Sequence, residues 1–213
     1  HRRLGHLNIQ DMGILDRTSG TGVSCNASNT LPGCDVCQLS KSKQQDHPKH
    51  RTTKPTTRKL ELVYTDLQGP LQPSLRNYSY TAMFMDDLTK IKKPYFLQAK
   101  SGALDSLYNF VNDIAIPEGL HVGRLRSDNG GEYTGKAFRD YCKTVGNKQE
   151  FTAPYTPQQN APIERAWGTL MAVTRCLLQE SGFPSVLWPE AFATATYIGN
   201  RVPPSSLAGG TPY

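Results

Sequence analysis

Residues 124–135 read RLRSDNGGEYTG, and the interpretation of the whole chain begins from this stretch. The segment 121–127 has the composition of a short strand, and Asp128 follows it directly. Two glycines then leave the backbone open before the next acid, Glu132. Taken alone, Asp-Asn-Gly-Gly is ordinary turn chemistry. A catalytic interpretation therefore requires other acidic residues that converge on the same place.

Length and composition indicate one ordinary domain with a small second one. The chain has 213 residues, 37% of them hydrophobic, which is enough for a core and argues against wholesale disorder. It contains no apolar run long enough to span a bilayer and no secretory leader, so we expect no membrane association. Its start at His1 and its abrupt end predict a piece of a longer polypeptide.

The net charge of +6 is concentrated in the first quarter of the chain. Residues 1–59 hold ten Lys/Arg and four Asp/Glu, whereas residues 60–213 hold fourteen of each. This asymmetry predicts an anionic partner for the first segment, with nucleic acid the leading candidate and a solvated basic surface the alternative. The odd number of cysteines, five, favours a reduced intracellular compartment over a secreted disulfide framework.

Two modules are predicted, 1–54 and 55–213. The segment 38–59 is polar, basic and rich in Thr, which is typical of an exposed connector. Beyond it, strands are expected at 60–66, 78–86, 94–99, 121–127 and 149–153. Helices are expected at 104–114, 137–146, 163–178 and 185–200. This order predicts an α/β domain with a mixed sheet, in which the first three strands form a meander.

The first module contains two histidines and two cysteines at a spacing that suits zinc: His1, His6, Cys34 and Cys37. Two imidazoles and two thiolates match tetrahedral Zn²⁺, and a module of this size gains stability from a structural metal. Alternative ligands of lower rank are Cys25, His47 and His50. A redox pair is disfavoured because no thioredoxin-like strand and helix surround the CDVC segment.

Three acidic residues follow or precede predicted elements of the second module: Asp66, Asp128 and Glu164. If the first and fourth strands are neighbours, Asp66 and Asp128 meet at one sheet edge, and a helix starting nearby adds Glu164. Such a cluster repels itself unless cations bind, and carboxylates are the ligands that Mg²⁺ or Mn²⁺ prefers. Two ions can then activate an attacking oxygen and stabilise a leaving oxygen. Glu132 is interpreted as a solvated neighbour, with a fourth metal ligand as the alternative.

The motifs together resemble the integrases of copia-type LTR retrotransposons over nearly the whole chain. HRRLGHLN and CDVC resemble the zinc module called the GAG-pre-integrase region, and YTDLQGP, RSDNGGEY and PYTPQQNAPIER resemble the three acidic motifs of the DDE core. The resemblance includes the gap of 35 residues before the glutamate. It implies an RNase H-like core with a mixed five-stranded sheet flanked by helices, preceded by a small, mainly helical zinc-binding module.

The resemblance also implies a function. A triad of Asp66, Asp128 and Glu164 would bind two divalent ions in a polynucleotidyl transferase that joins 3′-OH ends of element DNA to target DNA, with 3′-end trimming at the same site. The implied partners are DNA and further copies of the chain, in the nucleus of the host cell. The alternative is an impaired remnant that binds only zinc and DNA.

Predicted DNA contacts and departures from the family pattern lie mostly around the third acidic motif. The residues expected to contact DNA are Lys41, Lys43, Gln158, Asn160 and Arg165. The family usually reads PQQNGVAERKNRTL where this chain has Ala161, Ala166 and Gly168. Basic side chains at the last two positions would face DNA, so their loss predicts weaker binding. Side chains expected in the core are Cys142, Trp167, Cys176 and Trp188.

Overall fold

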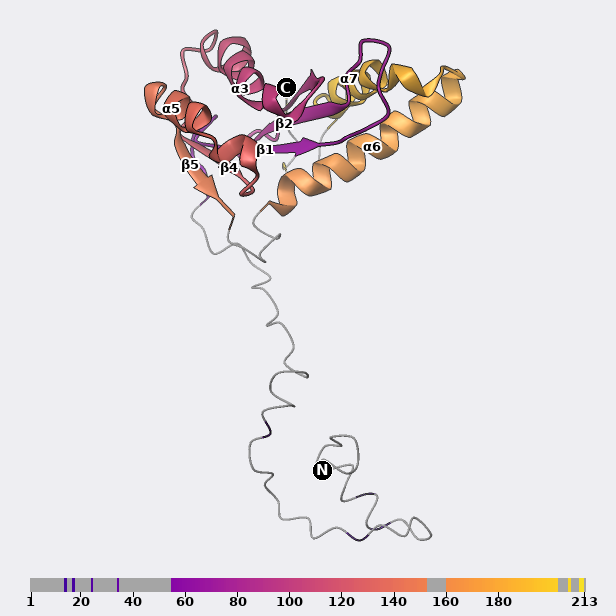
Figure 1. Ribbon diagram of the computed structural model, residues 1–213, viewed down its shortest axis with the longest axis horizontal. Coiled ribbons are helices and arrows are strands. Elements are labelled where there is room, and N and C mark those ends of the chain that lie inside the picture. The colour runs from indigo at the N-terminus through magenta and orange to yellow at the C-terminus, as the bar shows by residue number, and fades with distance from the viewer. Residues whose placement is uncertain are drawn as a thin grey trace. The chain divides into compact units, whose positions relative to one another are not determined.

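The computed structural model describes residues 55–152, 160–202, 207, 211 and 212, together with Ile14, Arg17, Ser24 and Cys34. The chain divides into two units, His1–Lys54 and Pro55–Tyr213. Almost all of the described residues belong to the second unit, which carries the sheet and the helices (Figure 1).

Five strands form one mixed sheet: β1 (Leu62–Gln68), β2 (Tyr80–Asp86), β3 (Lys92–Leu97), β4 (Arg124–Ser127) and β5 (Lys148–Phe151). Their order across the sheet is β3-β2-β1-β4-β5. The first three strands pair antiparallel as a meander, and β4 pairs parallel with both β1 and β5. The predicted mixed five-stranded sheet is confirmed, including the adjacency of the first and fourth strands on which the carboxylate hypothesis depended.

Helices connect and cover the strands: α3 (Ala103–Phe110), α4 (Gly131–Thr134), α5 (Lys136–Thr144), α6 (Ala161–Ser181) and α7 (Trp188–Gly199). The predicted helix at 104–114 is present, but its last part, Val111–Ala115, is wound as a π-helix. Short 3₁₀ turns occupy Lys100–Gly102 and Ser185–Leu187. The one-turn helix α4 was not expected, because its glycines indicated an open loop.

The sheet separates two apolar clusters, as the alternation of side chains along a strand requires. Along β1, Leu62 and Tyr64 pack with the cluster of α6 and α7, whereas Val63 packs with the cluster of α3 and α5. Figure 1 shows α3 and α5 on one side of the sheet and α6 and α7 on the other. Each large side chain buried in these clusters contributes on the order of 1.5–3 kcal/mol through the hydrophobic effect.

The helical layer of α7 is joined to the sheet by side-chain hydrogen bonds. Trp188 donates its indole N–H to the carbonyl of Gln72 at 2.8 Å, in the loop between β1 and β2. Asn200 bonds the backbone of Lys92 in both directions, at 3.0 and 2.8 Å, and so holds the β3 edge. These bonds, together with the burial of Trp188, confirm its predicted place in the core.

The start of the second unit is more ordered than its composition indicated. Thr56, within the predicted exposed connector 38–59, is buried and donates its hydroxyl to Asp87 at 3.0 Å. The backbone N–H of Leu60 bonds the Asp86 carboxylate at 2.9 Å. Two buried acids therefore accept hydrogen bonds from this segment, so its last residues belong to the folded core rather than to a linker.

Candidate active site

The pairing of β1 with β4 brings two acids to one edge of the sheet. The register of the pair places Tyr64 opposite Arg126, and each acid, Asp66 or Asp128, lies two residues further along the sequence. Asp128 follows β4 directly, as predicted, whereas β1 continues past Asp66 to Gln68. Asp66 is therefore held inside a paired strand, opposite Met83 of β2, instead of at a strand end.

Helix α6 supplies the third acid. Glu164 lies exposed in the first turn of α6, which packs against β1. The helix begins where the N–H groups of Ile163 and Glu164 bond the carbonyl of Asn160, at 3.1 and 3.2 Å. Pro162 lies in this first turn, where its missing N–H costs nothing. The helix thus directs its acidic N-terminal turn toward the β1–β4 edge.

The pKa of Asp66 indicates that the other two acids lie within electrostatic range of it. The pKa of Asp66 is raised to about 6 by burial first and by the charges of Asp128 and Glu164 second, against lowering contributions from the N–H of Leu67 and from Trp167. Both other acids are therefore close enough to act on Asp66. Within the described part of the chain, however, no group of three His, Cys, Asp or Glu side chains is close enough to hold a metal ion as it stands.

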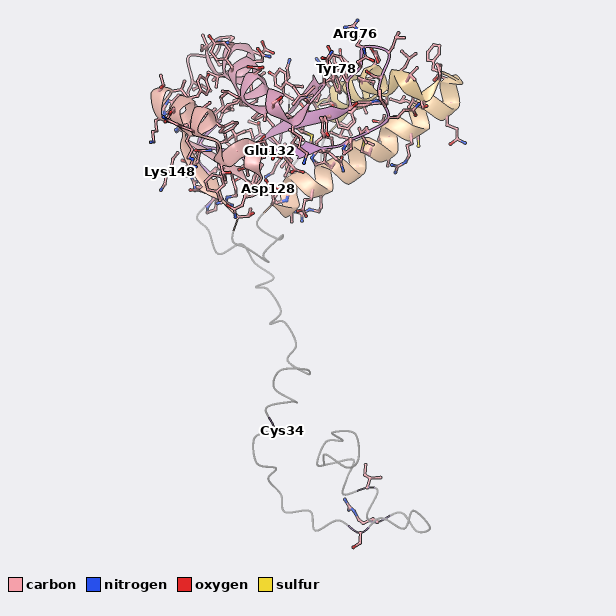
Figure 2. The ribbon with its side chains drawn as sticks, in the orientation of Figure 1. Cys34, Arg76, Tyr78, Asp128, Glu132 and Lys148 are labelled. Atoms are coloured by element: carbon pink, nitrogen blue, oxygen red, sulfur yellow. The ribbon has the colours of Figure 1, made fainter. Side chains whose placement is uncertain are left out.

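The loop after β4 is shaped around the Asp128 carboxylate. Gly130 donates its N–H to Asp128 Oδ1 at 2.9 Å. A Cβ on Gly130 would lie 3.0 Å from that oxygen and 2.8 Å from Glu132 Oε2, so glycine leaves the space that both carboxylates use. Glu132 is half-buried and lies with Asp128 at the same edge of the core (Figure 2). Its interpretation as a solvated neighbour stays a prediction.

Three further polar groups, which the sequence did not single out for function, are buried in this part of the core. The hydroxyls of Thr65 and Tyr133 and the indole N–H of Trp167 are buried without a hydrogen-bond partner that meets normal geometry. Tyr133 is 1% exposed, and burial raises its pKa, with Asp66, Asp128 and Glu132 adding to the rise. Trp167 is 4% exposed. Its predicted place in the core is confirmed, but its N–H also acts on Asp66.

The expectation that both Ala166 and Gly168 represent lost DNA-facing charges is wrong at the first position. Ala166 is 8% exposed and packs with Leu62 and Tyr64 in the apolar cluster under α6. A basic side chain would have to leave that cluster to reach solvent. Gly168 is exposed, and a Cβ there would touch nothing within 4 Å. Only position 168 can therefore carry a solvent-facing charge without rearrangement.

Gly168→Ala is expected to raise the free energy of unfolding by about 1 kcal/mol, because glycine weakens a helix interior and the new methyl group meets empty space. Chemical denaturation measures this change. Gly182→Ala is the matched control: Gly182 ends α6 with φ +67°, where a side chain is strained, so stability should fall by a similar amount. A destabilised Gly168→Ala would contradict the described packing of α6.

Of the predicted DNA contacts, the structure describes Asn160 and Arg165; Lys41, Lys43 and Gln158 lie outside the described residues. Arg165 is exposed beside Glu164. Asn160 occupies the N-cap position of α6 but makes no side-chain capping bond, and its side chain is buried with its Oδ1 unpaired. The backbone carbonyl of Asn160, rather than its side chain, therefore accepts the first hydrogen bonds of the helix.

Of the predicted zinc ligands, only Cys34 is described, and it is half-buried. His1, His6 and Cys37 lie outside the described residues, as do the alternatives Cys25, His47 and His50. Among the remaining cysteines, Cys142 is buried as expected. Cys176 is exposed on α6, so its predicted burial is wrong. Its place in the helical pattern alone did not reveal which face it occupies.

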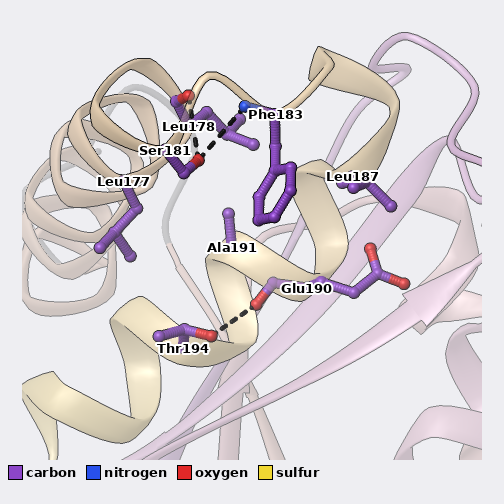
Figure 3. A pocket seen from close by; sticks show the side chains of 8 residues that line it. All are labelled: Leu177, Leu178, Ser181, Phe183, Leu187, Glu190, Ala191 and Thr194. Carbon is purple, nitrogen blue, oxygen red and sulfur yellow. Dashed lines mark hydrogen bonds between the residues drawn. The ribbon is translucent and has the colours of Figure 1, made fainter.

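A separate apolar pocket of about 260 Å³ lies between the end of α6 and the start of α7 (Figure 3). Its lining includes Leu177, Phe183 and Leu187, and Glu190 is the one ionisable side chain in it. None of the three acids of the sheet edge lines this pocket. Its chemistry therefore differs from that of a metal or phosphate site. No helix among the described residues has both the length and the apolar character needed to cross a membrane.

Comparison with solved structures identifies the fold class. The chain matches a simian T-cell lymphotropic virus intasome, solved with a PP2A regulatory subunit, with a TM-score of 0.65, 16% identity and coverage of 99% of this chain and 71% of the other. It also matches the HTLV-2 integrase catalytic core domain in complex with magnesium, with a TM-score of 0.54, 14% identity and coverage of 72% and 93%. The fold is that of the integrase catalytic core, which is RNase H-like.

Sequence comparison identifies homologues along the whole chain. The chain is 34% identical, over 98% of its length, to the retrovirus-related Pol polyprotein from transposon TNT 1-94 of Nicotiana tabacum. It is 30% identical over its whole length to that from transposon RE2 of Arabidopsis thaliana. Homologues of this chain are thus retrovirus-related Pol polyproteins of plant copia-type transposons. It spans 15% and 14% of their lengths. No family model matches the chain.

Proposed function

We propose that this chain is the integrase portion of a retrotransposon polyprotein and catalyses divalent-metal-dependent joining of 3′-OH ends of element DNA to target DNA. The observation that supports this most is the convergence of Asp66, Asp128 and Glu164 from β1, β4 and α6. Burial, and after it the charges of Asp128 and Glu164, raise the pKa of Asp66. The likeness of the fold to integrase cores, one of them solved with magnesium, is the second support.

The donor set fits a hard divalent cation. Carboxylate oxygens are the ligands that Mg²⁺ and Mn²⁺ prefer, and a cation would relieve the repulsion among the three acids. Asp128 and Glu164 are exposed and can move, whereas Asp66 is held in a paired strand. When bound, two such ions supply Lewis acidity to the attacking and the leaving oxygen of one phosphorus.

The protein's own groups prepare the site for DNA. With a pKa of about 6, Asp66 is mostly ionised at pH 7.5 and so is available as a ligand. Gly131 has no heavy atom within 4 Å of a would-be Cβ, which leaves the backbone open for a DNA strand to approach. Arg165 is exposed next to Glu164 and can contact a phosphate. Water in place of a 3′-OH would give end trimming at the same site.

The remaining parts of the proposal concern the first unit and the assembly. His1, His6, Cys34 and Cys37 would hold a structural Zn²⁺, and Lys41, Lys43 and Gln158 would contact DNA. Joining two DNA ends requires more than one copy of the chain. The intasome and the trimeric core among the similar structures support a multimer. The reaction would take place in the nucleus of the host cell.

Incubation of the chain with labelled duplexes and a supercoiled plasmid tests this function. We expect labelled plasmid in the presence of Mg²⁺ or Mn²⁺ and none with EDTA. An impaired remnant that only binds zinc and DNA would still bind the labelled duplexes, and this binding would weaken as the salt concentration rises. It would form no labelled plasmid with either Mg²⁺ or Mn²⁺. The absence of a basic side chain at position 166 was one argument for the impaired remnant. This argument is weakened, because Ala166 is buried in the core rather than placed on the surface.

A further inference from the structure

Helix α5 presents three basic side chains on one exposed face. Lys136, Arg139 and Lys143 are spaced three and four residues apart, so they lie next to one another along the helix, and all three are exposed. The residues of the opposite face are buried in the core. The helix holds three basic residues and one acid, whereas residues 60–213 hold fourteen of each. The exposed face of α5 is therefore a local concentration of positive charge.

The fold does not use these charges. The ion pairs between described residues engage other cations, which are Lys59, Lys90, Lys93, Arg124 and Arg126. Within the part of the chain that the structure describes, none of the three cations of α5 pairs with an acid. Arg139 is nevertheless held in place, because its Nε donates to the carbonyl of Thr134 at 2.7 Å. The remaining N–H groups of the fixed guanidinium are available to an anion.

Helix α5 adjoins the edge of the sheet at which the acids lie. Gly130 donates to the Asp128 carboxylate at 2.9 Å, and its carbonyl accepts the N–H of Thr134 at 3.2 Å. The bond from Arg139 to Thr134 continues this connection into α5. The helix also lies over β5, the strand next to β4 (Figure 1). A polyanion at the acidic edge would be repelled there, and the cations of α5 supply attraction beside it.

We propose that the exposed face of α5, formed by Lys136, Arg139 and Lys143, contacts the phosphate backbone of duplex DNA held at the acidic edge. The inference rests on the proposed function, since it takes DNA as the partner of that edge. The helical rise separates Lys136 and Lys143 by about 10 Å along the axis. Phosphates of one strand advance about 3.4 Å per nucleotide, so the face matches about three successive nucleotides. Such contacts position a duplex without reading its sequence.

Binding of the whole chain to a labelled duplex of arbitrary sequence tests the inference without catalysis. Fluorescence anisotropy in EDTA measures the association constant between about 50 and 200 mM KCl. Each phosphate contact contributes about 0.9 to the slope of its logarithm against the logarithm of the salt concentration. The triple variant Lys136→Gln, Arg139→Gln, Lys143→Gln should reduce this slope by about 2.7 and raise the dissociation constant at 0.1 M salt by at least about 10-fold.

The matched control removes the same number of charges from exposed positions outside α5. It combines Arg76→Gln in the loop between β1 and β2, Lys100→Gln after β3, and Arg175→Gln on α6. We expect the slope of the control to change by less than about 0.9, which is less than one phosphate contact. An equal loss in the two triple variants would show that only net charge matters, and it would overturn the role of α5.

The remaining outcomes separate this inference from the proposed function. An α5 variant with the affinity and the salt slope of wild type would overturn the inference, whether or not wild type joins DNA. A wild-type chain that does not bind the duplex at any of these salt concentrations would overturn both. If the α5 variant alone loses binding, but wild type forms no joined product with Mg²⁺ or Mn²⁺, the DNA-binding face stands and the joining function is overturned.

Discussion

Asp128→Asn is expected to reduce divalent-metal-dependent DNA joining by at least about 10³-fold, which corresponds to about 4 kcal/mol of transition-state stabilisation. The loss follows because asparagine removes one of the three negative charges that would hold the cations. The fold should persist, since Asp128 is exposed and an amide oxygen can still accept the N–H of Gly130. Single-turnover joining assays with Mg²⁺ and Mn²⁺ measure the change, and far-ultraviolet circular dichroism checks the fold.

Glu132→Gln is the matched variant for this experiment. It removes the same charge from the same loop, beside Gly130, but from a residue outside the proposed triad. We expect it to lose less than about 10-fold, in keeping with a rate effect of under 1.4 kcal/mol. Joining activity that survives Asp128→Asn would remove the triad from the mechanism. An equally large loss in Glu132→Gln would make Glu132 a fourth member of the site.

Asp66→Asn is expected to stabilise the metal-free protein by about 2 kcal/mol at pH 7.5, although it should abolish activity. The folded protein raises the pKa of Asp66 from 3.8 to about 6. The stability linked to this group is therefore fully present below pH 3.8 and is lost as the pH rises through 6. Asparagine avoids that loss. A change in the pKa of Asp66 from 3.8 to about 6 corresponds to about 3 kcal/mol of stability. Partial exposure of Asp66 and the loss of its hydrogen bond with the Leu67 N–H reduce the expected gain to about 2 kcal/mol.

Urea denaturation in EDTA at pH 7.5, 5.5 and 4 measures this effect. The advantage of Asp66→Asn should shrink at pH 5.5 and nearly vanish at pH 4, where Asp66 is protonated in the folded protein. Asp140→Asn, on the exposed surface of α5, should change stability by less than about 0.5 kcal/mol at each pH. Saturating Mg²⁺ should remove the advantage by stabilising the wild type. A variant that is less stable than wild type at pH 7.5 would contradict the raised pKa of Asp66.

Much of the core could be predicted because local patterns there agree with the tertiary structure. The strand and turn signals between residues 60 and 99 predicted the meander, and the helical spacing of Ile163, Trp167 and Leu170 predicted a long helix with a buried face. The sequence did not predict that β1 and β4 are adjacent, so their adjacency had to be assumed. It follows from pairing between distant segments, which no local signal reports.

Several features of the site depend on three-dimensional placement and were missed for that reason. Ala166 and Gly168 were treated alike as lost charges, yet helix rotation buries the first and exposes the second. Trp167 was assigned to the core correctly, but only the structure shows that its buried N–H lacks a hydrogen-bond partner of normal geometry. The glycine-rich stretch around Tyr133 indicated a loop. In the structure, Tyr133 belongs to the short helix α4, and its side chain is buried.

The central claim is that Asp66, Asp128 and Glu164 form one cation site, and anomalous diffraction from a crystal soaked in Mn²⁺ tests it most directly. We predict an anomalous peak in contact with the carboxylates of all three residues. A crystal that takes up Mn²⁺ elsewhere, with the three acids apart and without a peak between them, would contradict the account.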